Sequence, residues 1–598
     1  MRLNPGQQQA VEFVTGPCLV LAGAGSGKTR VITNKIAHLI RGCGYQARHI
    51  AAVTFTNKAA REMKERVGQT LGRKEARGLM ISTFHTLGLD IIKREYAALG
   101  MKANFSLFDD TDQLALLKEL TEGLIEDDKV LLQQLISTIS NWKNDLKTPS
   151  QAAASAIGER DRIFAHCYGL YDAHLKACNV LDFDDLILLP TLLLQRNEEV
   201  RERWQNKIRY LLVDEYQDSN QVQNCIFRAL SDRERRLFAV GDVKQSIYRF
   251  RGANIENILS FEKQYAGART IRLEQNYRST QNILDAANAV IRHNVGRKGK
   301  TLWTENGAGE VVTVKTCFNE GDEANYVVGQ IMMNYRRGRN WKDNAVLYRM
   351  NAQSNALEYA FKRNGVPYKI IGGTKFFDRA EVKDMLAYLC VINNPADDLR
   401  LRRIVNVPAR KIGAATMDKA QVIATEEGLP LMEVLRRAGD YPQLKASTGK
   451  LIAFTAMIDE MRRQADDMGL VEFYEYVCRR SGYVGMLQEK NDMESRGRLE
   501  NVEELSSSIQ AFLENDPENP TLSGFLDEVA LYTDLDSQEA GDNCVTLMTM
   551  HSAKGLEFPS VFVVGMEDGL FPGNRAMGEP EEMEEERRLG YVGMTRAT

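Results

Sequence analysis

The sequence predicts an α/β protein with two parallel-sheet domains, each carrying a mostly helical insertion. Short, continuous apolar runs of the kind that form buried parallel strands occur in two separate regions of the chain. Within each region, a long stretch with leucines and isoleucines at helical spacing and few glycines separates the runs. A helical insertion in each sheet domain is the simplest arrangement that accounts for both observations.

Four apolar runs predict the strands of the first sheet: residues 18–21, 50–53, 210–213 and 237–240. Each run ends at a polar or glycine-rich turn, which is where open α/β sheets bind their ligands. Residues from about 112 to 205 follow the helical pattern and predict the first insertion. We therefore expect the first sheet domain at residues 1–86 and 185–275, and its insertion at residues 87–184.

Five apolar runs predict the second sheet: residues 311–314, 345–348, 368–371, 545–548 and 561–564. Residues between about 377 and 540 are mostly helical in pattern and rich in charge. The second sheet domain is thus expected at residues 276–376 and 541–598, with its insertion at residues 377–540.

Composition sets the class of protein. With 598 residues, 43% hydrophobic and 26% charged, the chain resembles a soluble globular protein with room for about four domains. No apolar run approaches the ~20 residues that span a bilayer, and no targeting signal is visible, so we expect a cytoplasmic protein without membrane association. A net charge of −4 means that any nucleic-acid affinity must come from a local groove. The nine cysteines include no Cys-x-x-Cys pair, which argues against zinc, iron–sulfur and disulfide modules and predicts buried thiols.

A phosphate-binding loop follows the first predicted strand. Residues 22–29, Ala-Gly-Ala-Gly-Ser-Gly-Lys-Thr, nearly match the pattern G-x-x-x-x-G-K-[ST], with Ala22 at the first glycine. Glycines let the backbone turn its N–H groups around an anion, and a helix that begins near Lys28 points its positive end at that anion. Lys28 would reach the β- and γ-phosphates of ATP, and Thr29 would bind Mg²⁺. The alternative is a glycine-rich turn without a ligand, which the complete Gly-Lys-Thr ending disfavours.

A carboxylate pair, Asp214-Glu215, follows the third predicted strand. Asp214 is placed to hold Mg²⁺, and Glu215 can take a proton from the attacking water. Such a pair is common by chance after a strand. In a chain that also has a phosphate-binding loop, it predicts the second half of one nucleotide site.

Further motifs make the chain resemble the UvrD/Rep/PcrA family of superfamily 1A DNA helicases. They follow the family's order along nearly the whole chain: residues 54–60, 82–85, 182–186, 214–218, 240–248, 275–279, 372–377, 549–558 and 591–597. The resemblance implies that both sheet domains are RecA-like motor domains, called 1A and 2A, with insertions 1B and 2B. It also implies that ATP is bound between the two motor domains.

The resemblance assigns roles to individual residues of this ATP site. Gln7 would read the adenine edge, Tyr277 would stack on the base, and Glu557 would contact the ribose. Gln245 would sense the γ-phosphate, and Arg278 and Arg596 would be arginine fingers from the second motor domain. Positive charge from a separate domain would couple hydrolysis to domain closure. The other residues expected to bind the nucleotide are Gly25, Ser26, Gly27, Lys28, Thr29 and Arg30.

The resemblance also implies a track for single-stranded DNA, on which aromatic side chains stack bases of any sequence. The expected contacts are Phe55, Thr56, Asn57, Phe84, His85, Tyr248, Phe250, Arg251 and His551. Tyr248, Phe250 and Arg251 follow Gln245 closely, so one loop could report the nucleotide state to the stacked base. Aromatic residues after strands are also often core residues, which is the alternative for each of them.

Three features depart from the pattern of the family. Phe250 replaces the usual Trp, and Val243-Lys244 replaces a common acidic pair, as in the helicase subunits of AddAB-type nucleases. Residues up to about Ser219 resemble the Rep branch, whereas the remainder resembles another branch. The sequence ends at Thr598, just after Arg596, so we expect this arginine at an unsupported end of an incomplete 2A domain.

These observations predict an ATP-dependent translocase on single-stranded DNA and a 3′-to-5′ DNA helicase in replication or repair, with ATP and Mg²⁺ as cofactors. The expected partners are single-stranded and 3′-tailed duplex DNA, with self-association or replication and repair proteins as further candidates. The expected location is the bacterial cytoplasm, at the nucleoid. Two alternatives remain: the motor subunit of an AddAB-like recombination helicase–nuclease, and an ATP-gated DNA clamp that does not move.

Overall fold

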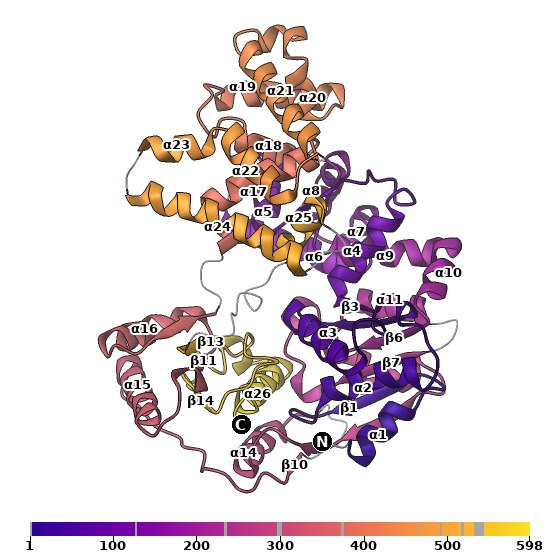
Figure 1. Cartoon of the computed structure of the whole chain (residues 1–598), viewed down its shortest axis with the longest axis vertical. Coiled ribbons are helices and arrows are strands. Elements are labelled where there is room, and N and C mark those ends of the chain that lie inside the picture. The colour runs from indigo at the N-terminus through magenta and orange to yellow at the C-terminus, as the bar shows by residue number, and fades with distance from the viewer. Residues whose placement is uncertain are drawn as a thin grey trace. The chain divides into compact units, whose positions relative to one another are not determined.

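The computed structural model describes residues 3–125, 128–231, 236–295, 302–371, 376–465, 467–490, 493–515, 520–531 and 543–598. Its contacts divide the chain into two compact units (Figure 1). Unit 1 comprises Met1–Leu87, Thr191–Gly373 and Thr533–Thr598, and unit 2 comprises Gly88–Pro190 and Thr374–Tyr532. The Gly372-Gly373 part of one motif lies outside the described residues.

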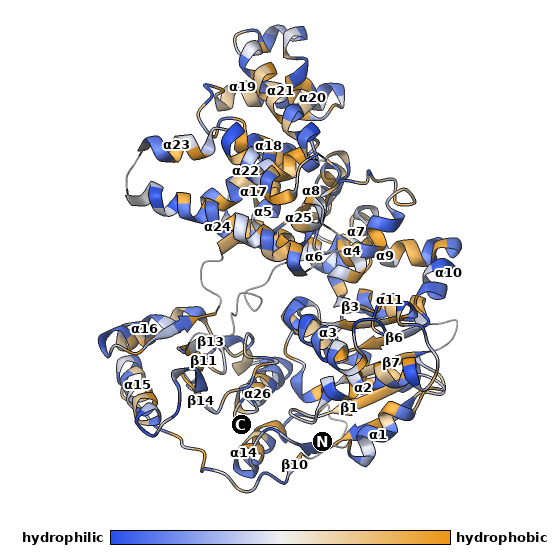
Figure 2. Ribbon diagram, viewed as in Figure 1, coloured by the Kyte–Doolittle hydropathy of each residue, from blue (hydrophilic) through white to orange (hydrophobic). Residues whose placement is uncertain are grey.

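Unit 1 contains a six-stranded sheet in which every strand pairing is parallel. Its order is β3 (Met80–Thr83), β2 (Ile50–Thr54), β6 (Tyr210–Val213), β7 (Leu237–Gly241), β1 (Cys18–Ala22) and β8 (Arg269–Leu273). The four predicted strands are all present, and every residue of each is buried. The hydrophobic colouring of these strands in Figure 2 reflects that burial. The helices of this part are α1 (Pro5–Glu12), α2 (Lys28–Arg41), α3 (Asn57–Leu71), α10 (Glu198–Lys207), α11 (Gln221–Ser231), α12 (Glu256–Leu259) and α13 (Phe261–Gln264).

A second parallel sheet of four strands also lies in unit 1. Its order is β12 (Tyr368–Ile370), β13 (Val545–Thr549), β11 (Asn344–Tyr348) and β14 (Ser560–Val563). Its helices are α14 (Gln281–Ile291), α15 (Glu320–Arg336), α16 (Ser354–Arg363) and α26 (Pro580–Met594), and a short ladder joins β9 (Gln275–Asn276) to β10 (Trp303–Thr304). Two parallel sheets confirm the predicted α/β class with two RecA-like domains.

An apolar cluster joins the two sheet regions of unit 1. Ile247 and Tyr248 follow the first sheet, and they pack with Leu347 and Met548 of the second sheet and with Leu589 of α26. All five residues are buried. The segment after β7, a strand of the first sheet, is therefore part of the core of the second sheet region.

Unit 2 is mostly helical, with one short parallel ladder between β4 (Ser106–Phe108) and β5 (Val180–Asp182). Its largest core lies among the later helices. The helices are α5 (Asp110–Leu120), α6 (Lys129–Asn144), α7 (Pro149–Ser155), α8 (Glu159–Ala177), α17 (Ala380–Asn393), α18 (Asp398–Ile404), α19 (Ala414–Glu427), α20 (Leu431–Arg436), α21 (Thr448–Gln464), α22 (Leu470–Arg480), α23 (Tyr483–Lys490), α24 (Met493–Asn515) and α25 (Leu522–Ala530). Helices α4 (Phe84–Glu95) and α9 (Asp185–Arg196) each continue from one unit into the other.

Two expectations from the sequence are wrong. Residues 311–314 form no strand, and Val311 and Val314 are 82% and 91% exposed, because β-branched residues make a strand only where a sheet gives them a partner. Residues 112–205 are mostly helical, as predicted, with the short strand β5 between two of the helices. Only Cys18, Cys167, Cys178 and Cys478 are buried, whereas Cys43 is exposed and the other four cysteines are half-buried.

Candidate nucleotide site and nucleic-acid track

The phosphate-binding loop connects the end of β1 to the start of α2 at Lys28, as predicted. Gly25 and Gly27 have φ values of 63° and 82°, in the left-handed region that favours glycine. A Cβ atom at Gly25 would also lie 2.7 Å from Cβ of Arg278. Glycine is therefore required here both by the turn and by the close approach of the arginine. The turn directs the N-terminus of α2, with its unpaired N–H groups, toward an anion site.

Lys28, Glu215 and Gln245 meet beside this loop. The Lys28 Nζ donates to Glu215 Oε1 at 2.8 Å and to Gln245 Oε1 at 3.4 Å. Glu215 has a φ of 50°, a left-handed conformation that costs a non-glycine residue about 1–3 kcal/mol and is common in active sites. Its other oxygen accepts from Gln217 Nε2 at 2.6 Å. The surrounding structure thus holds the carboxylate of Glu215 in one strained position beside the lysine.

The two neighbouring carboxyl groups have opposite protonation tendencies. Burial and the charge of Glu215 raise the pKa of Asp214 to about 7. Burial alone would also raise the pKa of Glu215, but Lys28 and Lys554 outweigh it and lower that pKa to about 2. The carboxyl group of Asp214 accepts a hydrogen bond from Glu215 N at 2.9 Å. A buried carboxyl group with a raised pKa gains its charged form when a cation lies beside it, so Asp214 suits a Mg²⁺ ligand, with Thr29 in the first turn of α2.

Arg278 lies against the phosphate-binding loop. The preceding Asn276 donates from Nδ2 to Ala24 O at 2.6 Å, and its Oδ1 accepts from the backbone N–H of Arg278 at 2.8 Å. The Arg278 Nε donates to Glu557 Oε2 at 2.8 Å. The structure therefore brings together the loop, Arg278 and Glu557, which are three parts of the expected site.

Arg596 is 2% exposed, and its guanidinium group donates to Val592 O at 2.9 Å and Leu556 O at 3.3 Å. Burial and the charge of Arg278 lower its pKa to about 9, whereas Glu215 acts to raise it. The expectation of an unsupported arginine is wrong, because Phe558 N donates to Arg596 O at 2.9 Å and Thr598 N donates to Phe558 O at 3.0 Å. Arg278 lies against the loop, and its charge acts on Arg596, so the two arginines are close enough to bind one polyanion together.

The two residues expected to contact the base, Gln7 and Tyr277, also bind the loop. Gln7 is fully buried, and its Nε2 donates to Ser26 O at 2.9 Å. Tyr277 is 39% exposed, and its backbone N–H donates to Gly25 O at 2.9 Å. Arg30 lies half-buried in the first turn of α2. Each of these residues is therefore on or next to the phosphate-binding loop.

Sequence reasoning missed Lys554, although it lies inside the motif at residues 549–558. Its Nζ forms an ion pair with Asp218 and donates to Gln245 O at 2.7 Å. The same ammonium group lies 5.1 Å from the centre of the Tyr248 ring. Lys554 thus connects the second sheet region to the γ-phosphate side of the site and to the aromatic cluster. Its spacing from His551 was the available signal, because one turn separates them.

Four of the expected nucleic-acid contacts, Phe55, Tyr248, Phe250 and His551, form one aromatic cluster. Phe55 stacks on Tyr248 with ring centroids 4.8 Å apart, and Phe250 meets His551 edge to face at 5.2 Å. The guanidinium group of Arg251 lies 5.7 Å from the Phe250 ring. Phe250 is 64% exposed, so its ring is available to a base. Thr56 caps helix α3, accepting from Ala59 N at 3.2 Å, and Asn57 is the first residue of that helix.

Two expected base contacts lie in the core instead. Phe84 is 5% exposed and packs against Phe227 with centroids 5.3 Å apart, so no face of its ring is open to a base in this arrangement. Tyr248 is 8% exposed, and its ring packs against the rings of Phe55 and Phe250. Burial lowers the pKa of both His85 and His551 to about 4, with Arg251 contributing to each. These two histidines are therefore uncharged at neutral pH.

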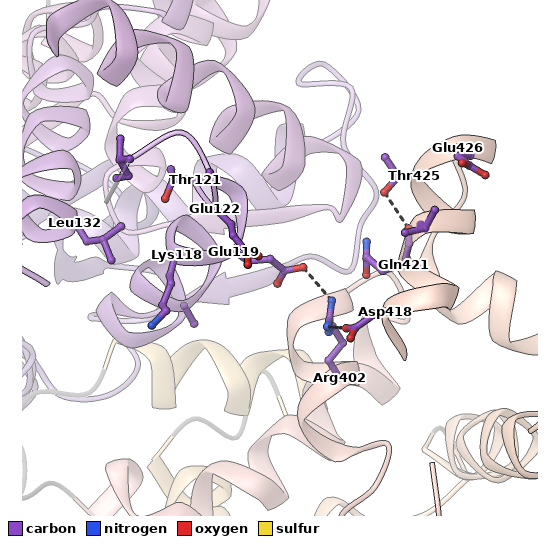
Figure 3. Close-up of a pocket in the computed structure, with 14 residues that line it drawn as sticks. Lys118, Glu119, Thr121, Glu122, Leu132, Arg402, Asp418, Gln421, Thr425 and Glu426 are labelled. Carbon is purple, nitrogen blue, oxygen red and sulfur yellow. Dashed lines mark hydrogen bonds and ion pairs between the residues drawn. The ribbon is translucent and has the colours of Figure 1, made fainter. Parts of the chain in front are cut away.

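A separate pocket of about 850 Å³ lies in unit 2 (Figure 3). Arg402 projects into it and donates to Glu119 Oε1 at 3.0 Å and to Asp418 Oδ1 at 2.7 Å. Such partly exposed ion pairs contribute little stability. None of the residues expected to bind ATP or DNA lines this pocket.

Among the described helices, none combines the length and the apolar character that crossing a bilayer requires.

Fold and site together define a P-loop protein in which two parallel-sheet regions meet at one phosphate-binding loop. The chain belongs to the UvrD/REP helicase family: residues 3–266 match the UvrD/REP helicase N-terminal domain, and residues 271–598 match the UvrD-like helicase C-terminal domain. It is 59% identical to ATP-dependent DNA helicase Rep of Escherichia coli (strain K12), over 100% of this chain and 90% of that protein. It is 44% identical to ATP-dependent DNA helicase PcrA of Staphylococcus aureus (strain COL), over 100% of this chain and 82% of that protein.

Proposed function

We propose that this chain is an ATP-driven translocase on single-stranded DNA and a 3′-to-5′ DNA helicase that acts in replication or repair. The observation that carries the proposal is the meeting of Lys28, Glu215 and Gln245 beside one loop, with Arg278 against the same loop. The charges of Arg278 and Glu215 both act on Arg596. The relatives named ATP-dependent DNA helicases support the same activity. The 3′-to-5′ polarity and the action on 3′-tailed duplex rest on family resemblance.

In the proposed reaction, Lys28 and the loop N–H groups of Gly25, Ser26 and Gly27 bind the phosphates of ATP. The positive charges of Arg278 and Arg596 stabilise the negative charge that develops on the oxygens of the transferred phosphoryl group in the transition state. Glu215 orients the attacking water and accepts its proton, after Lys28 has exchanged its ion pair with Glu215 for the phosphates. Mg²⁺, held by Thr29 and Asp214, would neutralise phosphate charge.

Hydrolysis would be coupled to DNA through the segment that follows β7. Gln245, which faces the γ-phosphate, and Phe250, which faces a base, are five residues apart in one segment. Tyr248 lies between them and contacts Phe55, Phe250 and Lys554. A shift of Gln245 on loss of the γ-phosphate would therefore move the aromatic cluster. The residues proposed to touch DNA are Phe55, Thr56, Asn57, His85, Phe250, Arg251 and His551.

The proposed organisation keeps the boundaries expected from the sequence, with motor domains 1A at 1–86 and 185–275 and 2A at 276–376 and 541–598. The helical insertions 1B and 2B occupy residues 87–184 and 377–540. We place the protein in the bacterial cytoplasm at the nucleoid, with replication or repair proteins as partners. An AddAB-like motor subunit is the second candidate, favoured only by Val243-Lys244 and Phe250.

The decisive experiment is ATP hydrolysis with and without single-stranded DNA. We expect strong stimulation by DNA, and loss of hydrolysis for Lys28→Ala. If nucleotide controls DNA binding while turnover stays negligible with DNA present, the protein is an ATP-gated clamp and the motor proposal fails. Unwinding of one duplex with a 3′ tail and one with a 5′ tail then tests the polarity.

A further inference from the structure

We propose that Asn4 is a specificity-determining positioning residue, which makes the nucleotide site select adenine by holding both Gln7 and Tyr277. The inference rests on the proposed ATP site and names a residue that the expected site did not include. Asn4 is the N-cap of α1. Its Oδ1 accepts from Gln7 N at 2.8 Å, and its backbone N–H donates to Gln7 Oε1 at 3.1 Å. This reciprocal capping box ties the side chain of Gln7 to the start of the helix.

The amide group of Gln7 has a single allowed orientation. Its Oε1 faces the N–H donor of Asn4, and its Nε2 faces the carbonyl acceptor of Ser26 at 2.9 Å. Exchanging the oxygen and the nitrogen would lose both hydrogen bonds inside the protein, where unpaired polar groups are costly. An amide has two N–H donors and two acceptor lone pairs, so the contacts with Asn4 and Ser26 leave one of each unused.

One donor beside one acceptor matches adenine. The edge of adenine presents the acceptor N7 next to the N6 amino donor, which an amide side chain can bind with two hydrogen bonds. Guanine presents two acceptors, N7 and O6, on the same edge. One of them would face the fixed oxygen of Gln7, so the site should bind GTP more weakly than ATP.

Asn4 also holds the tyrosine expected to stack on the base. Its Nδ2 donates to the hydroxyl oxygen of Tyr277 at 2.8 Å. That hydroxyl in turn donates to Gln275 Oε1 at 2.9 Å, and the backbone of Tyr277 is bound to Gly25 O. The ring is therefore fixed at both ends while 39% of the residue stays exposed. One side chain thus positions the group that reads the base edge and the group that covers the base face.

The test separates the contact of Asn4 with the Tyr277 hydroxyl from the capping of α1 by Asn4. Asn4→Ser keeps a good capping oxygen for α1 but removes the amide that reaches Tyr277. Tyr277→Phe keeps the ring and removes the hydroxyl. Because a lost hydrogen bond of this kind costs about 1 kcal/mol, we expect each variant to raise the KM for ATP about three- to tenfold, with kcat little changed. The double variant should match the single variants, because both remove the same contact.

Inorganic triphosphate, which has no base, provides the second readout. Its inhibition constant should be unchanged in Asn4→Ser, because the contact between Asn4 and Tyr277 affects only the binding of the base. Gln7→Ala should lower the preference for ATP over GTP. Asn197→Ser is the matched control: Asn197 caps α10 in the same way, accepting from Val200 N at 3.1 Å, and the substitution should leave the KM for ATP unchanged.

An unchanged KM in Asn4→Ser overturns the proposal, as do multiplying effects in the double variant or an equal weakening of triphosphate inhibition. Direct calorimetric binding of ATP and GTP keeps the two claims apart. If Asn4→Ser weakens the binding of ATP while the parent protein shows no DNA-stimulated hydrolysis, the proposed function fails and the role of Asn4 stands.

Discussion

Arg251 and His551 lie in the same aromatic cluster but differ in charge. Arg251 is charged and exposed, whereas burial lowers the pKa of His551 to about 4 and keeps it neutral. Each phosphate neutralised on a single strand contributes about 0.7 to the slope of log affinity against log salt. Arg251→Gln should therefore reduce this slope by about 0.7, and His551→Gln should leave it unchanged. Fluorescence anisotropy with a labelled oligonucleotide from 50 to 300 mM salt measures both; a smaller slope for the histidine variant would contradict a neutral ring.

His85 should make stability depend on pH. In the folded chain, burial and Arg251 lower its pKa from the usual 6.5 to about 4. Below pH 6.5 the imidazole of His85 binds a proton in the unfolded chain but not in the folded chain. The free energy of unfolding therefore falls as the pH drops toward 4. His85→Gln cannot bind this proton, so its free energy of unfolding should fall by about 1.6 kcal/mol less between pH 6.5 and 5 than that of the parent. Urea titrations at the two pH values provide the test, and equal losses would count against it.

Lys554 is nearly buried, and its partner Asp218 is fully buried. Removing one member of a buried ion pair leaves an unpaired charge and costs about 3 kcal/mol. Burial, opposed by Lys554, already raises the pKa of Asp218 to about 6, so Lys554→Met should drive this carboxyl group to take a proton. We expect Lys554→Met to be destabilised and Lys554→Met/Asp218→Asn to recover most of the loss in urea denaturation. If the double variant is no more stable than the single one, the ion pair is not the cause.

For individual residues, the sequence motifs predicted where a side chain lies better than they predicted how exposed it is. Lys28, Asp214, Glu215 and Gln245 lie together because each follows a strand of one parallel sheet, and strand ends converge at one edge. The burial of Phe84 could not be read from the sequence, because its partner Phe227 is 143 positions away. Asn4 and Lys554 act through contacts with distant segments, so a single sequence does not identify their partners, Tyr277 and Asp218.

At the scale of elements, the central strands were predictable and the edge strands were not. Strands β1, β2, β6 and β7 lie inside the sheet, buried on both faces, and appear as continuous apolar runs. The two edge strands, β3 and β8, mix buried residues with half-buried or exposed ones and include polar side chains such as Ser82 and Arg272. The exposed run at residues 311–314 shows the reverse error, in which strand-forming residues find no sheet.

Helix α26 connects the second sheet region to the segment after β7. Arg588, 8% exposed, donates from Nε to Ser246 O at 2.8 Å, and Glu585 Oε1 accepts from Arg249 N at 3.2 Å. Since α26 leads directly to Arg596, this helix links an arginine of the ATP site to the segment that carries Phe250. Arg588→Met should reduce the stimulation of ATP hydrolysis by DNA about tenfold, because one hydrogen bond to a charged group contributes roughly 1.5 kcal/mol.

The hydrolysis rate without DNA separates coupling from catalysis in Arg588→Met. It should stay within about twofold of the parent rate, because the lost bond of roughly 1.5 kcal/mol lies outside the site. Arg575→Met, which changes an exposed arginine of the preceding short helix, is the matched control. An equal loss of the rate with and without DNA would show that α26 acts on the chemistry alone.

On the scale of the whole molecule, the proposed nucleotide site takes residues from both sheet regions of unit 1, so a bound nucleotide should stabilise both. A ligand that binds only the folded state at 100 times its Kd adds about 2.7 kcal/mol. Hydrogen exchange with a non-hydrolysable ATP analogue should protect β6 and β7, and also β13 and the end of α26. Helix α21 of unit 2 has none of the proposed nucleotide ligands and provides the internal control. Protection confined to residues before 276, or unchanged by Arg596→Ala, would show that the second arginine does not reach the nucleotide and that the site lies in the first sheet region alone.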